Sequence, residues 1–300
     1  MKNVVIQFNS ASKQALRLSI ILFSLFLNSF TFAMDSDMSG EEMKTLGDAY
    51  YFGNEQQDQD YALSLEWYEK AAEAGYTPAN YDVGYAYAYG EGTETNYELA
   101  LEHFLVSANN GNPDAQYEVG LAYDHARGVK ENDRVAVEWY QKAADQDLPE
   151  AQYNLAYSYD YGEGIKEDDR LAFIWYQKSA EQGYIDAQNN LGAQYQAGEG
   201  VRTDYEKAFY WYQIAAAQGD STAQYNLAYL YKNGDGVKRD KEKAFELFAE
   251  SAEQGDPDAQ YELGLAYKHG EGTEKDLSEA IHWFQQAAEQ NQADAISELE

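Results

Sequence analysis

The sequence predicts an all-α fold, an α/α superhelical solenoid of about seven helix-turn-helix repeats of 36 residues each. Three residue types recur at this step along the chain. They are Ala79, Ala115, Ala151, Ala187, Ala223, Ala259 and Ala295; Gly92, Gly128, Gly164, Gly200, Gly236 and Gly272; and Tyr87, Tyr123, Tyr159, Tyr195, Tyr231 and Tyr267. A fixed period of this length indicates a solenoid, because each unit buries its apolar face only by stacking on its neighbours. We therefore expect one continuous repeat domain.

The N-terminal segment differs in character from the repeats. Basic residues at Lys2, Lys13 and Arg17 precede an apolar run over 18–27. This order is typical of a secretory signal peptide, and the run is shorter than the roughly 20 residues needed to cross a bilayer. We expect a signal peptide over 1–33, a short lead-in over 34–45, seven repeats over 46–294 and the start of a truncated or capping repeat over 295–300.

The amino-acid composition limits the cellular compartment in which we expect the protein and the classes of partner that it would bind. The chain has no cysteine, which excludes disulfides, thiol catalysis and a lipid-modified cysteine. Export without disulfides favours the bacterial periplasm, with secretion as the alternative. The segment over 1–33 holds three basic residues and no acidic one, so the mature net charge is (21 − 3) − 53 = −35. Such a surface disfavours nucleic acid and anionic membranes as partners. The acidic surface either serves only to keep the array soluble or also attracts basic partners.

Capping residues place two helices in each repeat. Asn112 before Pro113 predicts the start of the first helix, helix A, and Asp256 before Pro257 repeats this signal. A Gly-x-Gly sequence then ends helix A. A short polar residue precedes the second helix, helix B, at Asn96, Asn132, Asp168, Asp204, Asp240 and Asp276. Glycine marks its end at Gly111, Gly183, Gly219 and Gly255.

Two further patterns concern the core. Helix A carries an internal glycine at Gly84, Gly120, Gly192 and Gly264, at a cost of up to about 1 kcal/mol relative to alanine. We expect close approach to small residues of helix B, such as Ala136, to offset this cost. All five tryptophans, Trp67, Trp139, Trp175, Trp211 and Trp283, share one position of helix B. Because one tryptophan can bury about 150 to 250 Å², we expect them to anchor the core, with His103 and Leu247 as weaker substitutes.

The consensus Ala-Gln-Tyr-Asn-Leu-Ala/Gly-x-x-Tyr, Gly-x-Gly-Val, Asp, Ala-x-x-Trp-Tyr-x-x-Ala-Ala-x-x-Gly resembles the Sel1-like repeat, a relative of the tetratricopeptide repeat. The segment over 151–183 is a close match. The resemblance implies an adaptor or scaffold, as in bacterial envelope signalling, exopolysaccharide machinery, host interaction or eukaryotic protein quality control. A cysteine-rich branch of the family is linked to penicillin binding and β-lactamase activity, but this chain lacks the cysteines of that branch.

The residues contain no recognisable catalytic or metal site. The only Ser-x-x-Lys, from Ser10 to Lys13, lies in the expected signal peptide, whereas a serine β-lactamase needs that pair. The four histidines, His103, His125, His269 and His282, form no metal-binding motif. The Gly-Glu-Gly turn lacks the lysine of a phosphate loop, and acidic pairs such as Asp168 and Asp169 would bind Ca²⁺ weakly at most. We expect no catalytic residue, no cofactor and no metal, so a cell-wall or β-lactam hydrolase is the disfavoured alternative.

Positions of helix A outside the repeat consensus predict a partner-binding groove. In the tetratricopeptide repeat, which helix A resembles, this helix lines the concave face. Its non-core positions, the third, seventh, tenth and eleventh of each repeat, carry many tyrosines, which provide contact area at low entropic cost. The candidate binding residues are Tyr85, Tyr89, Tyr157, Tyr161, Tyr229, Lys232, Asn233, Lys268 and His269.

Charge at the tenth position changes sign along the chain. Early repeats carry Asp124 and Asp160, whereas late repeats carry Lys232 and Lys268. This polarity would orient a bound segment. We therefore expect a non-enzymatic scaffold of the bacterial envelope that binds a protein or peptide segment. A secreted factor that recognises a host protein is the alternative within the same class.

Overall fold

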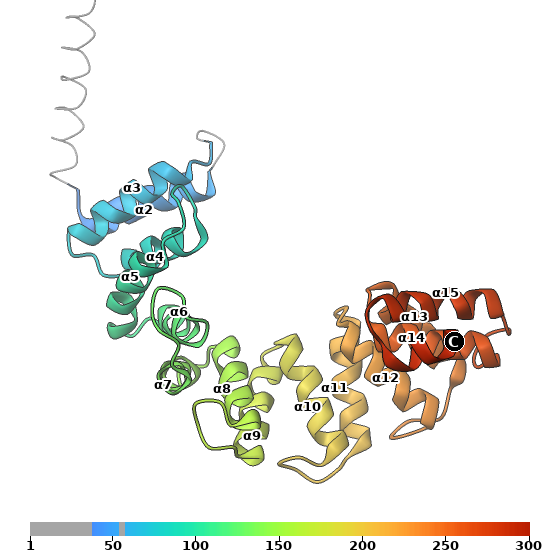
Figure 1. Cartoon of the computed structure of the whole chain (residues 1–300). Helices are drawn as coiled ribbons and strands as arrows, with labels where there is room; N and C mark the ends of the chain where they lie inside the picture. The colour runs from blue at the N-terminus through green and yellow to red at the C-terminus, as the bar shows by residue number, and fades with distance from the viewer. Residues whose placement is uncertain (1–37, 54–57) are drawn as a thin grey trace, which may run out of the picture. The chain divides into compact units, whose positions relative to one another are not determined.

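The computed structural model describes residues 38–53 and 58–300. Every regular element in these residues is an α-helix (Figure 1), which confirms the predicted all-α class. The expected signal peptide lies outside the described residues. The helices, labelled as in Figure 1, are α2 (Gly40–Phe52), α3 (Tyr61–Glu73), α4 (Ala79–Tyr89), α5 (Tyr97–Asn109), α6 (Pro113–Asp124), α7 (Asp133–Ala144), α8 (Pro149–Tyr161), α9 (Asp169–Glu181), α10 (Ile185–Ala197), α11 (Tyr205–Ala217), α12 (Ser221–Asn233), α13 (Lys241–Glu253), α14 (Pro257–His269), α15 (Leu277–Glu289) and α16 (Ala293–Leu299).

The even-numbered helices are copies of helix A and the odd-numbered ones are copies of helix B. Contacts group the chain into two compact units, residues 1–107 and 108–300, with the boundary near the end of α5. Within the first unit α2 packs on α3 and α3 on α4, and within the second each helix from α6 to α15 packs on the next. Helix α2 begins at Gly40, inside the expected lead-in over 34–45. None of the described helices is long and apolar enough to cross a membrane.

The predicted caps are confirmed. The carboxylate of Asp168 accepts a hydrogen bond from the backbone N–H of Leu171 at the start of α9. The equivalent residues of the other B helices do the same, at Asn96, Asn132, Asp204, Asp240 and Asp276. Asn112 and Asp256 cap α6 and α14, each followed by proline. Each cap satisfies an amide that the helix itself leaves without a partner.

The second glycine of each Gly-x-Gly turn joins neighbouring repeats. Gly164 has φ = +68°, and a Cβ built on it would lie 2.4 Å from the carbonyl carbon of Asp133, at the start of the preceding helix B. A Cβ built on Gly200 would lie 2.1 Å from the carbonyl oxygen of Asp169. The sequence pattern predicted only a helix stop here. The structure shows that glycine is also needed because two backbones touch.

The internal glycines of helix A face a large ring rather than the small residues of helix B. A Cβ on Gly120 would lie 2.5 Å from Cε1 of Tyr140, and one on Gly192 would lie 2.7 Å from Cδ1 of Tyr212. The sequence predicts that these glycines pack closely against alanines of helix B, such as Ala136. This prediction is wrong, because the group nearest to each glycine is an aromatic ring. The ring belongs to the residue that follows the tryptophan position, and it is the largest fully buried side chain of its hairpin.

The tryptophans belong to the core or pack against it, as expected for Trp67, Trp175, Trp211 and Trp283, but most of them lie at its edge. Only Trp175 is buried, at 8 % exposure, whereas Trp67, Trp139, Trp211 and Trp283 are half-buried. A lysine three residues later covers several of them, with Lys142 Nζ 3.3 Å from the ring centroid of Trp139. Tyr140, Tyr176 and Tyr212 fill the centre instead, at 2 %, 0 % and 1 % exposure.

Buried glutamines link successive repeats in the second unit. Gln152 of α8 donates a hydrogen bond to the carbonyl oxygen of Ala144 in α7, at 3.2 Å. Its own side-chain oxygen accepts one from Gln182, the C-cap of α9, at 2.9 Å. The same ladder recurs around Gln116, Gln188 and Gln260. Each amide thereby satisfies its polar atoms while connecting three helices.

Candidate functional site

The third position of helix A belongs to the core of its own hairpin. Tyr117 and Tyr153 are half-buried, and their ring centroids lie 5.8 Å and 5.7 Å from those of Tyr140 and Tyr176 on helix B. Tyr81, Tyr225 and Tyr261 pack in the same way on Phe104, Phe248 and Phe284. These tyrosines therefore contribute to packing within the repeat.

The seventh and eleventh positions form tyrosine pairs in two repeats, with Tyr85 half-buried and the other three rings exposed. The rings of Tyr85 and Tyr89 in α4 lie 4.4 Å apart, and those of Tyr157 and Tyr161 in α8 are separated by the same distance. Tyr89, Tyr157 and Tyr161 are 48 %, 36 % and 61 % exposed. Two adjacent rings on one helix face present a rigid aromatic surface with hydroxyl groups at its edge.

The third predicted pair is built differently. Tyr229 of α12 is half-buried, packs edge-on against Phe248 at 5.5 Å and donates a hydrogen bond to Glu262 of the next helix A. Asn233, at the eleventh position, is exposed, as is His269 of α14. The contacts of Tyr229 serve the stacking of repeats.

The two predicted lysines form ion pairs with the following repeat. Lys232 Nζ lies 2.5 Å from Oε2 of Glu262, whose side chain is only 8 % exposed, and Lys268 pairs with Glu298. Each cation is thus already neutralised by a carboxylate 30 residues later. Because Glu262 is buried, its pair with Lys232 holds α12 and α14 in register.

The charge at the tenth position of helix A depends on whether the buried ring of helix B is tyrosine or phenylalanine. The hydroxyl of a buried tyrosine donates to this position, at 2.8 Å from Tyr140 to Asp124, 3.3 Å from Tyr176 to Asp160 and 2.9 Å from Tyr212 to Gln196. Where helix B carries phenylalanine, no acceptor is needed, and the tenth position is Ala88, Lys232 or Lys268. Core chemistry thus accounts for the charge pattern, and its role in orienting a partner stays a prediction.

Two cavities adjoin the tyrosine pairs. The first cavity, of about 450 Å³, lies among α2, α3, α4 and the turn after α4, and its lining includes Tyr85. The second cavity has the same volume in the other unit and is lined by Tyr157, Asp124, His125 and Glu163, among others. Each predicted tyrosine pair is therefore next to a concave surface that could receive a side chain of a partner.

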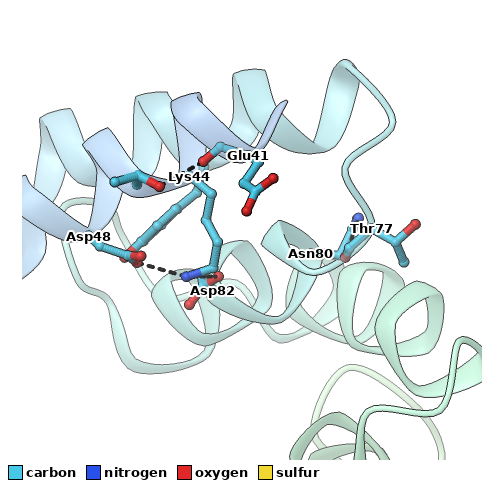
Figure 2. A network of polar contacts seen from close by, with 8 residues as sticks. Glu41, Lys44, Asp48, Thr77, Asn80 and Asp82 are labelled. Carbon is cyan, nitrogen blue, oxygen red and sulfur yellow. Dashed lines mark hydrogen bonds and ion pairs between the residues drawn. The ribbon is translucent and has the colours of Figure 1, made fainter. Parts of the chain in front are cut away.

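The first cavity contains a charged network that the repeat pattern did not reveal (Figure 2). Lys44 Nζ in α2 lies 2.8 Å from Oδ1 of Asp48 and 3.4 Å from Oδ2 of Asp82 in α4. Lys44 and Asp48 were missed because the first repeat is out of register with the others. Asp82 was missed because it lies beside a core position that the consensus assigns to packing.

Burial governs the ionisation of this network. Burial raises the pKa of Asp82 to about 6, although the charge of Lys44 acts in the opposite direction. Burial alone would lower the pKa of Lys44, but its hydrogen bond to Asp48 and the nearby carboxylates hold that pKa above its usual value. A carboxylate kept in such surroundings is a common feature of functional sites.

The histidines do not come together. His103 Nδ1 lies 2.9 Å from Oδ1 of Asn80, and burial lowers the pKa of His103. His125 lies at the limit of an ion pair with Asp124, 4.0 Å away. Within residues 38–53 and 58–300, no group of three or more histidine and carboxylate side chains is arranged to hold a metal ion.

Comparison with known proteins identifies the repeat. A family model described as Sel1 repeat matches seven consecutive segments, at residues 46–76, 77–112, 113–148, 149–184, 185–220, 221–256 and 257–292. No match was found among curated proteins.

Solved structures give two informative similarities. A protective antigen present in uropathogenic Escherichia coli strains, with a Sel1-like repeat fold, is 34 % identical with a TM-score of 0.79. The match covers 90 % of this chain and 57 % of that one, so this chain spans little more than half of the antigen's length. A Sel1 repeat protein from Oxalobacter formigenes is 31 % identical with a TM-score of 0.69, over 87 % of this chain and 75 % of that one.

Proposed function

This chain belongs to the Sel1 repeat family, and we propose that it is a non-enzymatic scaffold of the bacterial cell envelope that binds a protein segment. The observation that carries this proposal is the two tyrosine pairs on helix A, Tyr85 with Tyr89 and Tyr157 with Tyr161, in which every ring except the half-buried Tyr85 is exposed. Two adjacent rings on one helix face offer a large contact area to a protein segment.

The fold itself does not require these rings. The repeat over 185–220 has alanine at both positions, Ala193 and Ala197, and forms the same two helices with the same caps. Paired tyrosines in only some repeats are therefore additions to a scaffold that is complete without them. Tyrosine is enriched at protein interfaces because it combines a large apolar ring with a polar tip.

Location in the envelope rests on the N-terminal sequence. The basic residues, the apolar run over 18–27 and the ending at Ala33 support export by a signal peptide. N-terminal sequencing of the purified protein should begin at Met34, and the protein should be found in the periplasmic fraction. A protein that retains Met1 and fractionates with the cytoplasm would contradict this part of the proposal.

Secretion toward a host is the second candidate, and one observation favours it. The similar Escherichia coli protein is described as a protective antigen. Recovery of this chain from culture supernatant rather than from periplasm would support that role. Hydrolysis assays with a β-lactam and with cell-wall fragments should show no activity of the purified protein above background.

The binding surface is tested by crosslinking followed by pull-down. One variant replaces exposed tyrosines of helix A with alanine, at Tyr89, Tyr157 and Tyr161. A matched control does the same on helix B, where Tyr97, Tyr205 and Tyr210 are 43 %, 40 % and 55 % exposed. We expect partners captured by the unmodified chain to be lost with the first variant and kept with the control. Equal capture by both variants would contradict a helix A binding surface.

A further inference from the structure

The first cavity has an unbalanced charge. Asp48, Asp82 and Glu91 contribute three carboxylates to its lining, and Lys44 contributes one ammonium. Three negative charges against one positive charge leave an excess of two when all the groups are ionised. Because carboxylates are costly to remove from water, a cavity with this composition favours a further cation.

Polar atoms in the same lining lack hydrogen-bond partners. The hydroxyl of Ser64, which is 1 % exposed, has none, and neither does Oε2 of Glu91. Oδ2 of Asp82 also makes no hydrogen bond, and its ion-pair partner, Lys44 Nζ, lies 3.4 Å away. The described residues contain five such side-chain atoms, and three of them belong to this cavity. The second cavity has the same volume but contains none of them. Buried polar atoms are nearly always satisfied, so this concentration indicates that a donor is supplied by a ligand.

Aromatic rings form the remaining wall. Tyr51 and Tyr61 meet edge to face at 5.3 Å, and the lining also includes Tyr68 and Tyr85. Phe52 and Tyr61 are 75 % and 36 % exposed. Aromatic faces beside carboxylates are a typical setting for an organic cation. The chain itself provides an example, because Lys44 Nζ lies 5.4 Å from the centroid of Tyr68 while it contacts Asp48.

We infer that the first cavity binds the ammonium group of a lysine side chain carried by the partner segment. An ammonium donates three hydrogen bonds in separate directions, whereas a planar guanidinium suits the two oxygens of one carboxylate. The atoms that make no hydrogen bond come from three elements, namely Ser64 in α3, Asp82 in α4 and Glu91 in the turn after α4. This inference rests on the proposed function, since it specifies which residue of a bound segment this end of the chain selects.

Short peptides test the inference without knowledge of the partner. The probe is acetyl-Gly-Ser-Lys-Ser-Gly-amide, titrated by NMR into protein purified from cells that express the whole sequence. Comparison peptides carry norleucine, arginine or acetyl-lysine in place of lysine. Norleucine and acetyl-lysine lack the charge, and arginine retains it in planar form.

Two variants accompany the titration. Glu91→Gln removes one charge from the first cavity and keeps the shape of the side chain. Glu163→Gln is the matched control, because Glu163 occupies the same repeat position 72 residues later and lines the second cavity. If Glu91→Gln does not fold by circular dichroism, Tyr61→Leu at the cavity rim replaces it.

We expect the lysine peptide to shift the resonances of Tyr51, Tyr61 and Tyr85. Glu91→Gln should weaken the affinity for this peptide at least fivefold, whereas Glu163→Gln should leave the affinity unchanged. The arginine peptide should bind more weakly, and the two uncharged peptides should not bind measurably. Equal binding of lysine and norleucine peptides, or equal effects of the two variants, would overturn the inference. If pull-down partners still depend on the helix A tyrosines in that case, the scaffold function stands and only the lysine site is wrong.

Discussion

At the scale of single residues, the change of charge at the tenth position of helix A is explained by a buried tyrosine hydroxyl of helix B and the acceptor that it needs. Tyr212 is 1 % exposed, and its hydroxyl donates to Oε1 of Gln196 at 2.9 Å. The repeat with Phe104 needs no acceptor and has Ala88 at the same place. A hydroxyl that loses its partner in the interior carries the cost of desolvation, whereas removal of both groups does not.

This pairing predicts a double-mutant cycle. Gln196→Ala should lower the free energy of unfolding by about 1 to 3 kcal/mol, because the hydroxyl of Tyr212 loses its acceptor. Adding Tyr212→Phe should recover part of that loss, because the pair then matches Phe104 and Ala88. Urea unfolding of the two single variants and the double variant gives the coupling energy. Strict additivity of the two substitutions would show that the hydrogen bond does not couple these residues.

The raised pKa of Asp82 predicts a pH-dependent effect on stability. An acid with a folded pKa near 6 binds its proton more tightly in the folded state, so its contribution to stability falls as pH rises from about 4 to 6. Asp82→Asn should therefore be more stable than the unmodified chain at pH 8, by about 1 to 3 kcal/mol. Thermal unfolding between pH 4 and pH 8 should show this difference shrinking toward acid pH. A constant difference would mean that Asp82 is not held in an unfavourable ionised state.

At the scale of elements, helix A depends on glycine where a ring of helix B crosses it. A Cβ on Gly192 would lie 2.7 Å from two ring carbons of Tyr212. In two repeats alanine takes this position, as Ala156 and Ala228, and both are fully buried. The hairpin can therefore accommodate one methyl group at this position if the ring of helix B shifts.

Gly192→Ala should destabilise the protein even though alanine favours helices. Overpacking costs about 1 to 3 kcal/mol, which exceeds the gain in helix propensity of up to about 1 kcal/mol. Ala156→Gly is the matched comparison and should also destabilise the protein, by about 1 kcal/mol through helix propensity and further through the loss of a buried methyl group. A higher melting temperature for Gly192→Ala would refute the close contact with Tyr212.

Much of the element level could be predicted from the sequence because it depends on local chemistry. The helix B caps, from Asn96 to Asp276, and the Gly-x-Gly turns each act within a few residues. The sequence could not predict whether the tryptophan or the aromatic residue after it is the buried one. The two residues are adjacent on helix B, and only the packing of neighbouring helices decides which of them faces the core. The same limit applies to Lys232, whose partner Glu262 lies in the next repeat.

At the scale of the whole molecule, repetition separates what the fold needs from what it does not. Glutamine ladders, backbone contacts at the second glycine and the buried rings recur from repeat to repeat. Within the described part of the chain, the tyrosine pair at the seventh and eleventh positions is found only in the repeats of α4 and α8, and the charged network of the first cavity lies among α2, α3 and α4. The tyrosine pairs were found from the sequence because they depart from its period. The cavity was missed because the irregular first repeat conceals the residues that α2 brings to α4.

The most direct test of a binding role compares affinity with stability in the same variants. The partner captured by crosslinking is titrated against the unmodified chain, the helix A variant lacking Tyr89, Tyr157 and Tyr161, and the helix B control. Because these side chains are exposed, we expect the melting temperature of the helix A variant to change by no more than about 2 °C. We expect its affinity to fall at least about tenfold, as for central interface tyrosines. Unchanged affinity together with a melting temperature lowered by more than about 5 °C would show that these tyrosines serve packing.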